Sequence, residues 1–361
     1  MLRIAFVVAF VVAFVVASVA QANVGRSRFP GTRTTEPTGL REIAIEREDL
    51  RFDLRPLGEG GIAKVSATYH LNNRSAATVT APLVFVSGAP AARDEVTFDR
   101  GPVPGDILRA DQLGAIPPSW RAPLSTPAIG GGPSLGYETD HDVAMTFTLA
   151  IPPGRHELVV TYEAIAQRNK SAAGGTLLYQ LGYVLAPARD WGSFGTLEVV
   201  VEVPAGWRVA TSPALTRTGD TLRARFPSLP ADTIGITLQA PTGMLHDVLQ
   251  IALPLLAILV LAGGGVALFA IGRAWGRRRD DLRGIWPVAL PAALLWAVAI
   301  AVSGGLTALR SDLSIPEGQS AAHGYGAAGG VLLAVLAALV AMPVGFALAR
   351  AGSRRGALDA P

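Results

Sequence analysis

Residues 248–272 read VLQIALPLLAILVLAGGGVALFAIG, and none of these side chains is charged. Two more runs of the same character follow at 285–308 and 326–349. A helix of about 20 apolar residues spans the hydrocarbon core of a bilayer, so each run is long enough to cross it. The sequence therefore predicts a bundle of three transmembrane helices behind a larger and more polar N-terminal part.

Arginines concentrate at the ends of these runs. Five lie in the loop 273–284 and three in the tail 350–361, whereas the loop 309–325 has Arg310 beside two acidic residues. Basic residues stay on the cytoplasmic side of a membrane. The loop 273–284 and the C-terminus are thus predicted to be cytoplasmic, and the loop 309–325 extracytoplasmic. The prediction rests on Arg273, Arg277, Arg278, Arg279, Arg283, Arg350, Arg354 and Arg355.

The first 22 residues have the pattern of a secretory signal peptide. Arg3 is followed by an apolar stretch at 4–17, and Ala20-Gln21-Ala22 fits a small-x-small cleavage site. The competing interpretation is an uncleaved anchor, because 4–20 could span a thin bilayer when tilted. In either case the segment that follows is exported.

Composition narrows the class of protein. Only Lys64 and Lys170 among the 31 basic residues are lysines, and Ala, Gly and Pro are abundant, which favours a GC-rich bacterial genome and hence the bacterial inner membrane. Cysteine is absent, which excludes disulfides, thiol nucleophiles and thiolate metal sites. A net charge of +3 does not favour a nucleic-acid partner.

The exported segment, 23–243, alternates apolar and polar residues with period two. The runs 64–71 and 196–203 both put an apolar side chain at every second position. Successive side chains of a strand point to opposite faces, so each run predicts a half-buried strand. Turn residues such as Pro152-Pro153-Gly154 separate the runs. Short strands at this spacing predict a mainly β, antiparallel sandwich.

A Pro/Gly-rich stretch without periodicity, 114–136, interrupts the strands. It predicts a linker between two β-units at about 40–110 and 140–242, of which the second has enough strands for an immunoglobulin-like sandwich. The alternative is one larger sandwich that carries this stretch as an insertion.

Small residues recur at four-residue intervals in the second and third apolar runs, so they share a helix face and permit close backbone approach. This predicts packing within the bundle or against a second membrane protein. Because the runs contain neither charged residues nor His, a channel or pump formed by this chain alone is not favoured. The packing candidates are Ala293, Ala297, Ala301, Gly305, Gly326, Gly330, Ala337, Ala341 and Gly345.

Two motifs deserve weighing as sites, and both are weak. Ser134 lies in a G-x-S-x-G pattern with His141 nearby, but a nucleophile needs a strand-to-helix turn there and a strand pattern follows instead. Glu138, Asp140 and Asp142 could contribute oxygens to a cation, although an exposed acidic turn is the simpler interpretation. No catalytic residue and no cofactor are predicted.

These observations predict a non-catalytic ectodomain anchored in a membrane, an interaction or accessory subunit of a cell-envelope complex. Its expected partners are the lipid bilayer and another membrane or envelope protein. The alternative is a ligand-sensing or substrate-binding ectodomain coupled to a transporter or signalling partner, with a pocket near Trp120 and Trp191. An exported hydrolase is less favoured.

Overall fold

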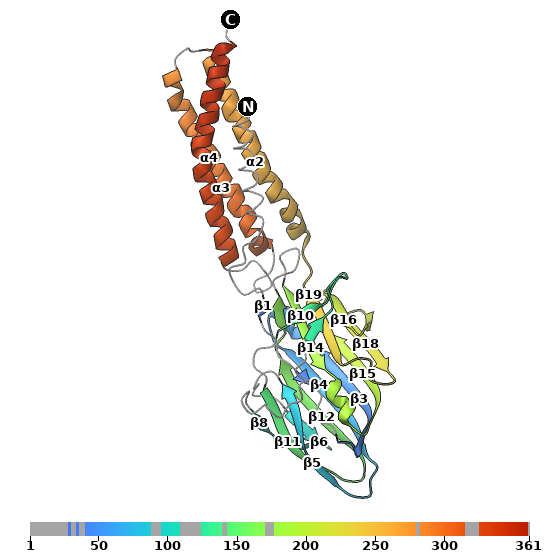
Figure 1. Ribbon diagram of the computed structural model, residues 1–361. Coiled ribbons are helices and arrows are strands. Elements are labelled where there is room, and N and C mark those ends of the chain that lie inside the picture. Colours follow the sequence, from blue (N-terminus) through green and yellow to red (C-terminus); the bar gives the residue numbers. More distant parts are fainter. Residues whose placement is uncertain are drawn as a thin grey trace. The chain divides into compact units, whose positions relative to one another are not determined.

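The computed structural model (Figure 1) describes residues 28–29, 34–35, 40–87, 95–108, 124–138, 143–169, 177–278, 282–314 and 325–359. The predicted signal peptide at 1–22 lies outside these residues. The chain has two compact units, one formed by Arg28–Ala172 with Leu177–Pro241 and one that includes Thr242–Pro361. The first contains the strands and the second three long helices. This confirms a large, mainly β N-terminal part followed by three apolar helices.

The largest sheet has eight strands in the order β17-β18-β15-β3-β4-β12-β6-β7. Neighbouring strands are antiparallel except β15 and β3, which run parallel. The strands are β3 (Ile43–Asp53), β4 (Ala63–Asn73), β6 (Glu95–Phe98), β7 (Gly101–Pro102), β12 (Gly154–Ala164), β15 (Ser193–Glu202), β17 (Thr216–Thr218) and β18 (Thr221–Phe226).

The remaining strands form three smaller sheets. One has the order β1-β13-β14-β19-β16 with β2 beside β14, another the order β5-β11-β8, and β9 pairs with β10. Their bounds are β1 (Arg28–Phe29), β2 (Thr34–Thr35), β5 (Val79–Ser87), β8 (Asp106–Leu108), β9 (Leu124–Thr126), β10 (Leu135–Tyr137), β11 (Val143–Ile151), β13 (Gln167–Asn169), β14 (Leu178–Val184), β16 (Arg208–Ser212) and β19 (Thr233–Gln239), with short 3₁₀ helices η1 (Arg55–Glu59) and η4 (Ala186–Asp190).

The core of the β-unit lies on one face of the eight-stranded sheet. The apolar positions of β4 that the sequence predicts to be buried are confirmed, since each is at most 1% exposed between 65 and 71. From this face Phe52 meets Tyr183 of β14 edge-on, with ring centroids 5.9 Å apart. Tyr162 meets Phe85 of β5 at 5.2 Å. Aromatic contacts of this kind tie the large sheet to both the six-stranded and the three-stranded sheet.

The two β-units predicted from the sequence share one sheet. Strands β3 and β4, from the first predicted unit, pair with β15 and β12 from the second. These four strands thus belong to one sheet within one compact unit. The stretch expected to be a linker, 114–136, contains β9 and the start of β10. Strands of three residues are too short to show a period among prolines and glycines.

A buried polar network holds the β9–β10 hairpin on the sheet beneath it. Gln180 is fully buried, and its Oε1 accepts hydrogen bonds from Gln167 (3.0 Å) and Asn169 (3.1 Å). Its Nε2 donates to Thr126 Oγ1 at 2.6 Å, and Thr237 lies 2.9 Å from the same oxygen. Buried polar groups that all find partners specify one arrangement, so the network fixes the hairpin on β14 and β19.

Three helices form the second unit: α2 (Met244–Gly276), α3 (Trp286–Ser314) and α4 (Tyr325–Leu358), with the 3₁₀ helix η5 (Leu282–Ile285) before α3. All three are long and apolar enough to cross a membrane. Each corresponds to one of the apolar runs of the sequence and extends beyond its C-terminal end. The largest extension is in α4, which continues nine residues past position 349 to Leu358.

Helices α2 and α4 touch backbone to backbone near their C-terminal ends. A Cβ atom on Gly272 would lie 1.9 Å from the carbonyl oxygen of Ala349, and one on Gly276 equally close to that of Ser353. Conversely, a Cβ atom on Gly352 or Gly356 of α4 would lie 2.1 Å from a backbone carbonyl oxygen of α2, that of Phe269 or Arg273 respectively. Two reciprocal G-x-x-x-G pairs thus let the helices approach more closely than any side chain would permit.

The contact predicts that a larger residue at Gly272 separates α2 from α4. We expect Gly272→Leu to lower the free energy of unfolding by about 1–3 kcal/mol, the usual cost of overpacking. Gly263→Leu is the matched control, because nothing lies within 4 Å of a Cβ there. Thermal unfolding of the detergent-solubilised protein measures both. Equal midpoints for the two variants would contradict the proposed role of the contact.

Candidate functional site

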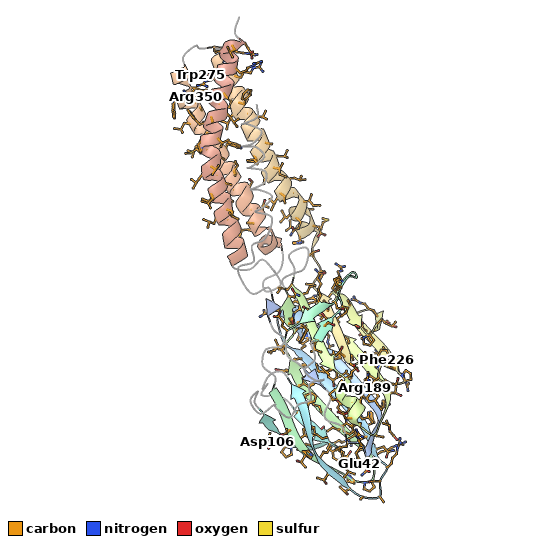
Figure 2. All side chains as sticks on the ribbon, viewed as in Figure 1. Glu42, Asp106, Arg189, Phe226, Trp275 and Arg350 are labelled. Atoms are coloured by element: carbon orange, nitrogen blue, oxygen red, sulfur yellow. The ribbon has the colours of Figure 1, made fainter. Side chains whose placement is uncertain are left out.

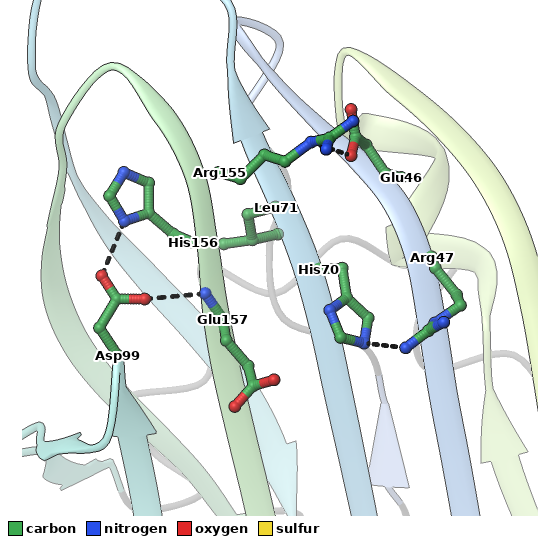
Figure 3. Close-up of a pocket in the computed structure, with 8 residues that line it drawn as sticks. All are labelled: Glu46, Arg47, His70, Leu71, Asp99, Arg155, His156 and Glu157. Atoms are coloured by element: carbon green, nitrogen blue, oxygen red, sulfur yellow. Dashed lines mark hydrogen bonds and ion pairs between the residues drawn. The ribbon is translucent and has the colours of Figure 1, made fainter.

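A cavity of about 480 Å³ opens over strands β3, β4 and β12 of the large sheet. Figure 3 shows Asp99 and His156 on one side of Leu71, with His70 and Arg47 on the other. Seven of the eight lining side chains are ionisable: Glu46, Arg47, His70, Asp99, Arg155, His156 and Glu157.

A β-bulge turns two successive residues of β3 toward this cavity. The pairing of β3 with β4 shifts register between Ile45 and Arg47, so Glu46 is the extra residue. The neighbouring strand β15 makes room for it with Gly195, where a Cβ atom would lie 2.1 Å from the Glu46 carbonyl oxygen. Without the bulge, Glu46 and Arg47 would point to opposite faces of the sheet.

Arg47, His70 and Glu157 stand in one row across three strands, because Arg47 pairs with His70 and His70 with Glu157 in the ladder. The Nη2 of Arg47 lies 2.8 Å from His70 Nε2 and 3.0 Å from the carboxylate of Asp49. The same His70 nitrogen lies 3.0 Å from that carboxylate. The arginine, the histidine and the aspartate therefore form one charged cluster on the exposed face.

Glu46 is held between two donors on neighbouring strands. Asn72 Nδ2 donates to Glu46 Oε1 at 2.7 Å, and Arg155 Nε lies 2.9 Å from Oε2. The hydrogen bond from Asn72, together with the guanidinium of Arg155, lowers the pKa of Glu46 below its ordinary value despite some burial. The carboxylate is therefore ionised and fixed at neutral pH.

Asp99 reaches the cavity from a strained hairpin turn. Asp99 and Arg100 connect β6 to β7, and both have positive φ, 47° and 69°. Two-residue hairpin loops with this geometry usually contain Asn and Gly, so two larger residues store strain here. Two hydrogen bonds of 2.9 Å between Asp99 and the backbone of Glu157 hold the turn in place.

His156 is locked between two acceptors. Its Nδ1 lies 2.7 Å from Asp99 Oδ2 and its Nε2 3.0 Å from the carbonyl oxygen of Pro152, while Phe98 stacks on the ring. Burial by itself raises the pKa of Asp99, but the Glu157 N–H and the His156 imidazole outweigh it and the net pKa is lowered. Both ring nitrogens of His156 therefore lie within 3.0 Å of an oxygen atom.

Most ionisable side chains of the cavity already have partners. The imidazole of His156 contacts Asp99 and the Pro152 carbonyl oxygen, and the Nε2 of His70 is in contact with Arg47 and Asp49. Serine, threonine, cysteine, tyrosine and lysine are absent from the residues that line the cavity. What the cavity offers is an array of positive and negative groups, several of which are held by ion pairs and hydrogen bonds.

The weak motifs of the sequence lie elsewhere. Glu138 is exposed after β10 and donates its N–H to Gln167, whereas Asp140, His141 and Asp142 lie outside the described residues. Ser134 is exposed immediately before β10, so a strand follows it. Among the described residues, no three His, Asp or Glu side chains are placed to hold a metal ion.

The pocket predicted near Trp120 and Trp191 does not coincide with this cavity. Trp191 is 4% exposed and is not among the lining residues, and Trp120 lies outside the described residues.

The small-residue rows of the helices have mixed surroundings. Ala293, Ala297 and Ala341 are at most 6% exposed. Ala301 and Ala337 are partly buried and pack against the apolar cluster that contains Ala297 and Ala341. A Cβ on Gly345 or Gly330 would meet a neighbouring helix within 2.8 Å, whereas Gly305 faces open space. Gly326 lies in the first turn of α4.

The sequence analysis missed both the glycine pairs and the cavity. The spacing of Gly272 with Gly276 and of Gly352 with Gly356 was available as a signal, but it falls at or beyond the ends of the apolar runs. The cavity had no such signal, since Asp99 and His156 are 57 positions apart.

The lowered pKa values of Asp99 and Glu46 predict a loss of stability in acid. Their contribution is complete above the ordinary carboxyl pKa of about 4 and disappears as pH falls through the lower folded-state values. Asp99→Asn should therefore be less stable than the wild type at pH 7, and the difference should shrink below about pH 4. Urea unfolding across this range measures it. A difference that does not change with pH would contradict the assignment.

No protein-family model and no curated protein matches this sequence. A crystal structure from Legionella pneumophila subsp. pneumophila strain Philadelphia 1, provisionally described as a nutrient-binding protein, is similar over 86% of this chain and 100% of that chain, with 13% identity and a TM-score of 0.45. Yeast LTA4 hydrolase with bestatin matches 56% of this chain and 29% of its own, with 14% identity and a TM-score of 0.31. Native yeast LTA4 hydrolase matches 57% of this chain and 31% of its own, with 14% identity and a TM-score of 0.32. At these values none of the likenesses identifies a family or a function.

Proposed function

We propose that this protein is a non-catalytic interaction or accessory subunit of a bacterial cell-envelope complex. Its β-unit is an exported sandwich, immunoglobulin-like in general character, and its helices anchor it in the inner membrane with the C-terminus in the cytoplasm. The observation that carries the proposal is the outer face of the eight-stranded sheet, where ion pairs join side chains from strand to strand.

These ion pairs extend across much of the sheet. On one side Arg225 of β18 pairs with Glu198 of β15 at 3.5 Å. In the middle Arg51 of β3 pairs with Glu202 of β15 at 2.7 Å. Toward the cavity, the pair between Arg155 and Glu46 joins β12 to β3. Exposed pairs of this kind add little to stability, typically less than 1 kcal/mol each.

A face of this kind is suited to recognition. The opposite face of the same strands is packed in the core, so the charged groups stand on a rigid support. Fixed charges of both signs favour a partner with the complementary pattern and disfavour others, and they raise the rate of encounter. Several side chains of the cavity fit the same role, since Glu46 is paired with Arg155 and Asp99 with His156.

The anchor supports this function in a second way. One span would suffice for tethering, and this chain has three long apolar helices. Apolar side chains such as Leu259 and Leu295 are exposed on their outer surfaces, at 68% and 70%. We infer that the bundle meets lipid and a membrane partner through these surfaces, while the β-unit contacts the same complex outside the cytoplasm.

Purification of the tagged full-length protein in a mild detergent tests the proposal. We expect a membrane or envelope protein to co-elute in a fixed ratio, and Arg47→Glu with Arg155→Glu to reduce its recovery at least about tenfold, because like charges would then oppose each other. Arg208→Glu is the control, since Arg208 is exposed on β16 of another sheet. Elution of the protein alone, or undiminished recovery with the reversed charges, would refute the proposal.

The cavity favours a second candidate, a ligand-binding ectodomain. Its volume suits a small solute, and the mixture of arginines, histidines and carboxylates suits one with charges of both signs, such as an amino acid or a dipeptide.

Isothermal titration of the full-length protein with a panel of amino acids and dipeptides examines this candidate. We expect saturable binding of at least one zwitterion, weakened about tenfold or more by Glu157→Gln, and unchanged by Glu163→Gln on the same strand outside the cavity. Absence of saturable heat across the panel would count against the second candidate and would leave the first intact.

A further inference from the structure

Two arginine-rich segments from different parts of the sequence lie together at one end of the helical unit. One follows the apolar run of α2 and the other that of α4, and Figure 2 shows Trp275 and Arg350 at this same end. We call this group the arginine layer. Its described members are Arg273, Arg277, Arg278, Arg350, Arg354 and Arg355.

The glycine contacts are the reason that the two segments cannot diverge. Gly276 packs on the backbone of Ser353, and Gly356 packs on that of Arg273. Both contacts lie within the layer itself. Six guanidinium groups are therefore concentrated around two touching backbones, where their mutual repulsion would otherwise push the helices apart.

Acidic residues in the described part of this region neutralise only a fraction of the charge. Asp359 lies 2.7 Å from Arg273 and 3.6 Å from Arg355. The other four arginines are exposed, and within the described residues none of them has a carboxylate partner. The segments 273–283 and 350–359 together contain eight arginines and three aspartates, so the excess of positive charge is a property of the sequence as well. The four exposed arginines are Arg277, Arg278, Arg350 and Arg354.

Several exposed arginines of the β-unit are paired with acidic side chains. Arg51, Arg55 and Arg155 each have a carboxylate within 3.1 Å. Among the described residues, Arg277, Arg278, Arg350 and Arg354 have no carboxylate at such a distance, so their charge is available to an anionic partner.

The position of the layer indicates which anionic group lies near these arginines. The arginines begin where the apolar runs end, which is the depth of the lipid headgroups. Trp275 lies among them and Trp286, 54% exposed, starts the next helix, as expected of an aromatic belt at the interface. Guanidinium groups bind phosphate through two parallel hydrogen bonds, which an ammonium group cannot reproduce.

We propose that the arginine layer is a binding site for the headgroups of anionic phospholipids, which hold the ends of α2 and α4 together by bridging their arginines. The proposal requires only that the helices lie in a membrane, so it is independent of the protein partner proposed above. It differs from a role in topology alone, because orientation depends on charge and would be the same with Lys at these positions.

Native mass spectrometry of the full-length protein in a non-ionic detergent tests the proposal. The protein is titrated with dioleoyl phosphatidylglycerol and, separately, with dioleoyl phosphatidylcholine. We expect phosphatidylglycerol to bind at least about tenfold more tightly, since each basic residue near an anionic surface contributes attraction, and we expect the difference to diminish with added salt. Equal affinity for the two lipids would overturn the proposal. So would saturation of the site by inorganic phosphate alone.

Three variants with matched charge changes locate the site. Arg277→Gln with Arg278→Gln and Arg354→Gln should reduce the preference for phosphatidylglycerol to less than about twofold. The same three positions changed to Lys keep the charge and the topology, and they should lose part of the preference because bidentate binding is lost. The Lys variant also tests the proposal if the Gln variant does not fold. The control removes three charges from the β-unit, and an equal loss there would show a general effect of net charge and refute the site. Its substitutions are Arg51→Gln, Arg155→Gln and Arg225→Gln.

Discussion

The β-unit depends on the different surroundings of the two faces of its eight-stranded sheet. One face is covered by two smaller sheets through buried aromatic side chains. Two of these, Tyr69 and Tyr183, also share a hydrogen bond of 3.2 Å between their hydroxyl groups. Burial of this face supplies most of the stabilisation, at roughly 25 cal/mol per Å² of apolar surface. The other face is therefore free to carry charged residues that contribute little to stability, and Arg47, His70 and Glu157 of the candidate site lie in one row on it.

The sequence predicted those parts of the fold that a local period determines. The alternation in 64–71 and the three apolar runs led directly to buried strand positions and long helices. The joining of β3 to β15 and of β4 to β12 was left open, because pairing between distant strands leaves no trace in either strand alone. The bulge at Glu46 was hidden for a similar reason. It shows only when the register of β3 is read against β4.

The candidate site was harder to predict than the fold. Its charged residues resemble any solvated strand face, and their meaning arises from neighbours on other strands, such as His70 beside Arg47. The glycine pairs of α2 and α4 are a different case. Their four-residue spacing is local and readable, but it concerns the ends of helices, where the boundary between apolar run and loop is the least certain part of a sequence-based assignment.

The cavity draws together two departures from regular β-structure, and both consume free energy. The bulge displaces Glu46 from the pleat, and the turn places Asp99 and Arg100 in the left-handed region, at a typical cost of about 1 kcal/mol or more for each residue. The surrounding contacts are sufficient to hold both: Gly195 leaves space for the bulge, and Glu157 bonds the turn. Charged residues that served only solubility would need neither the bulge nor the turn, since any exposed charge contributes to solubility. Fixing charged groups on a rigid sheet reduces the entropy lost when a partner or ligand binds them. In the function proposed above, this local strain would serve as pre-organisation for recognition.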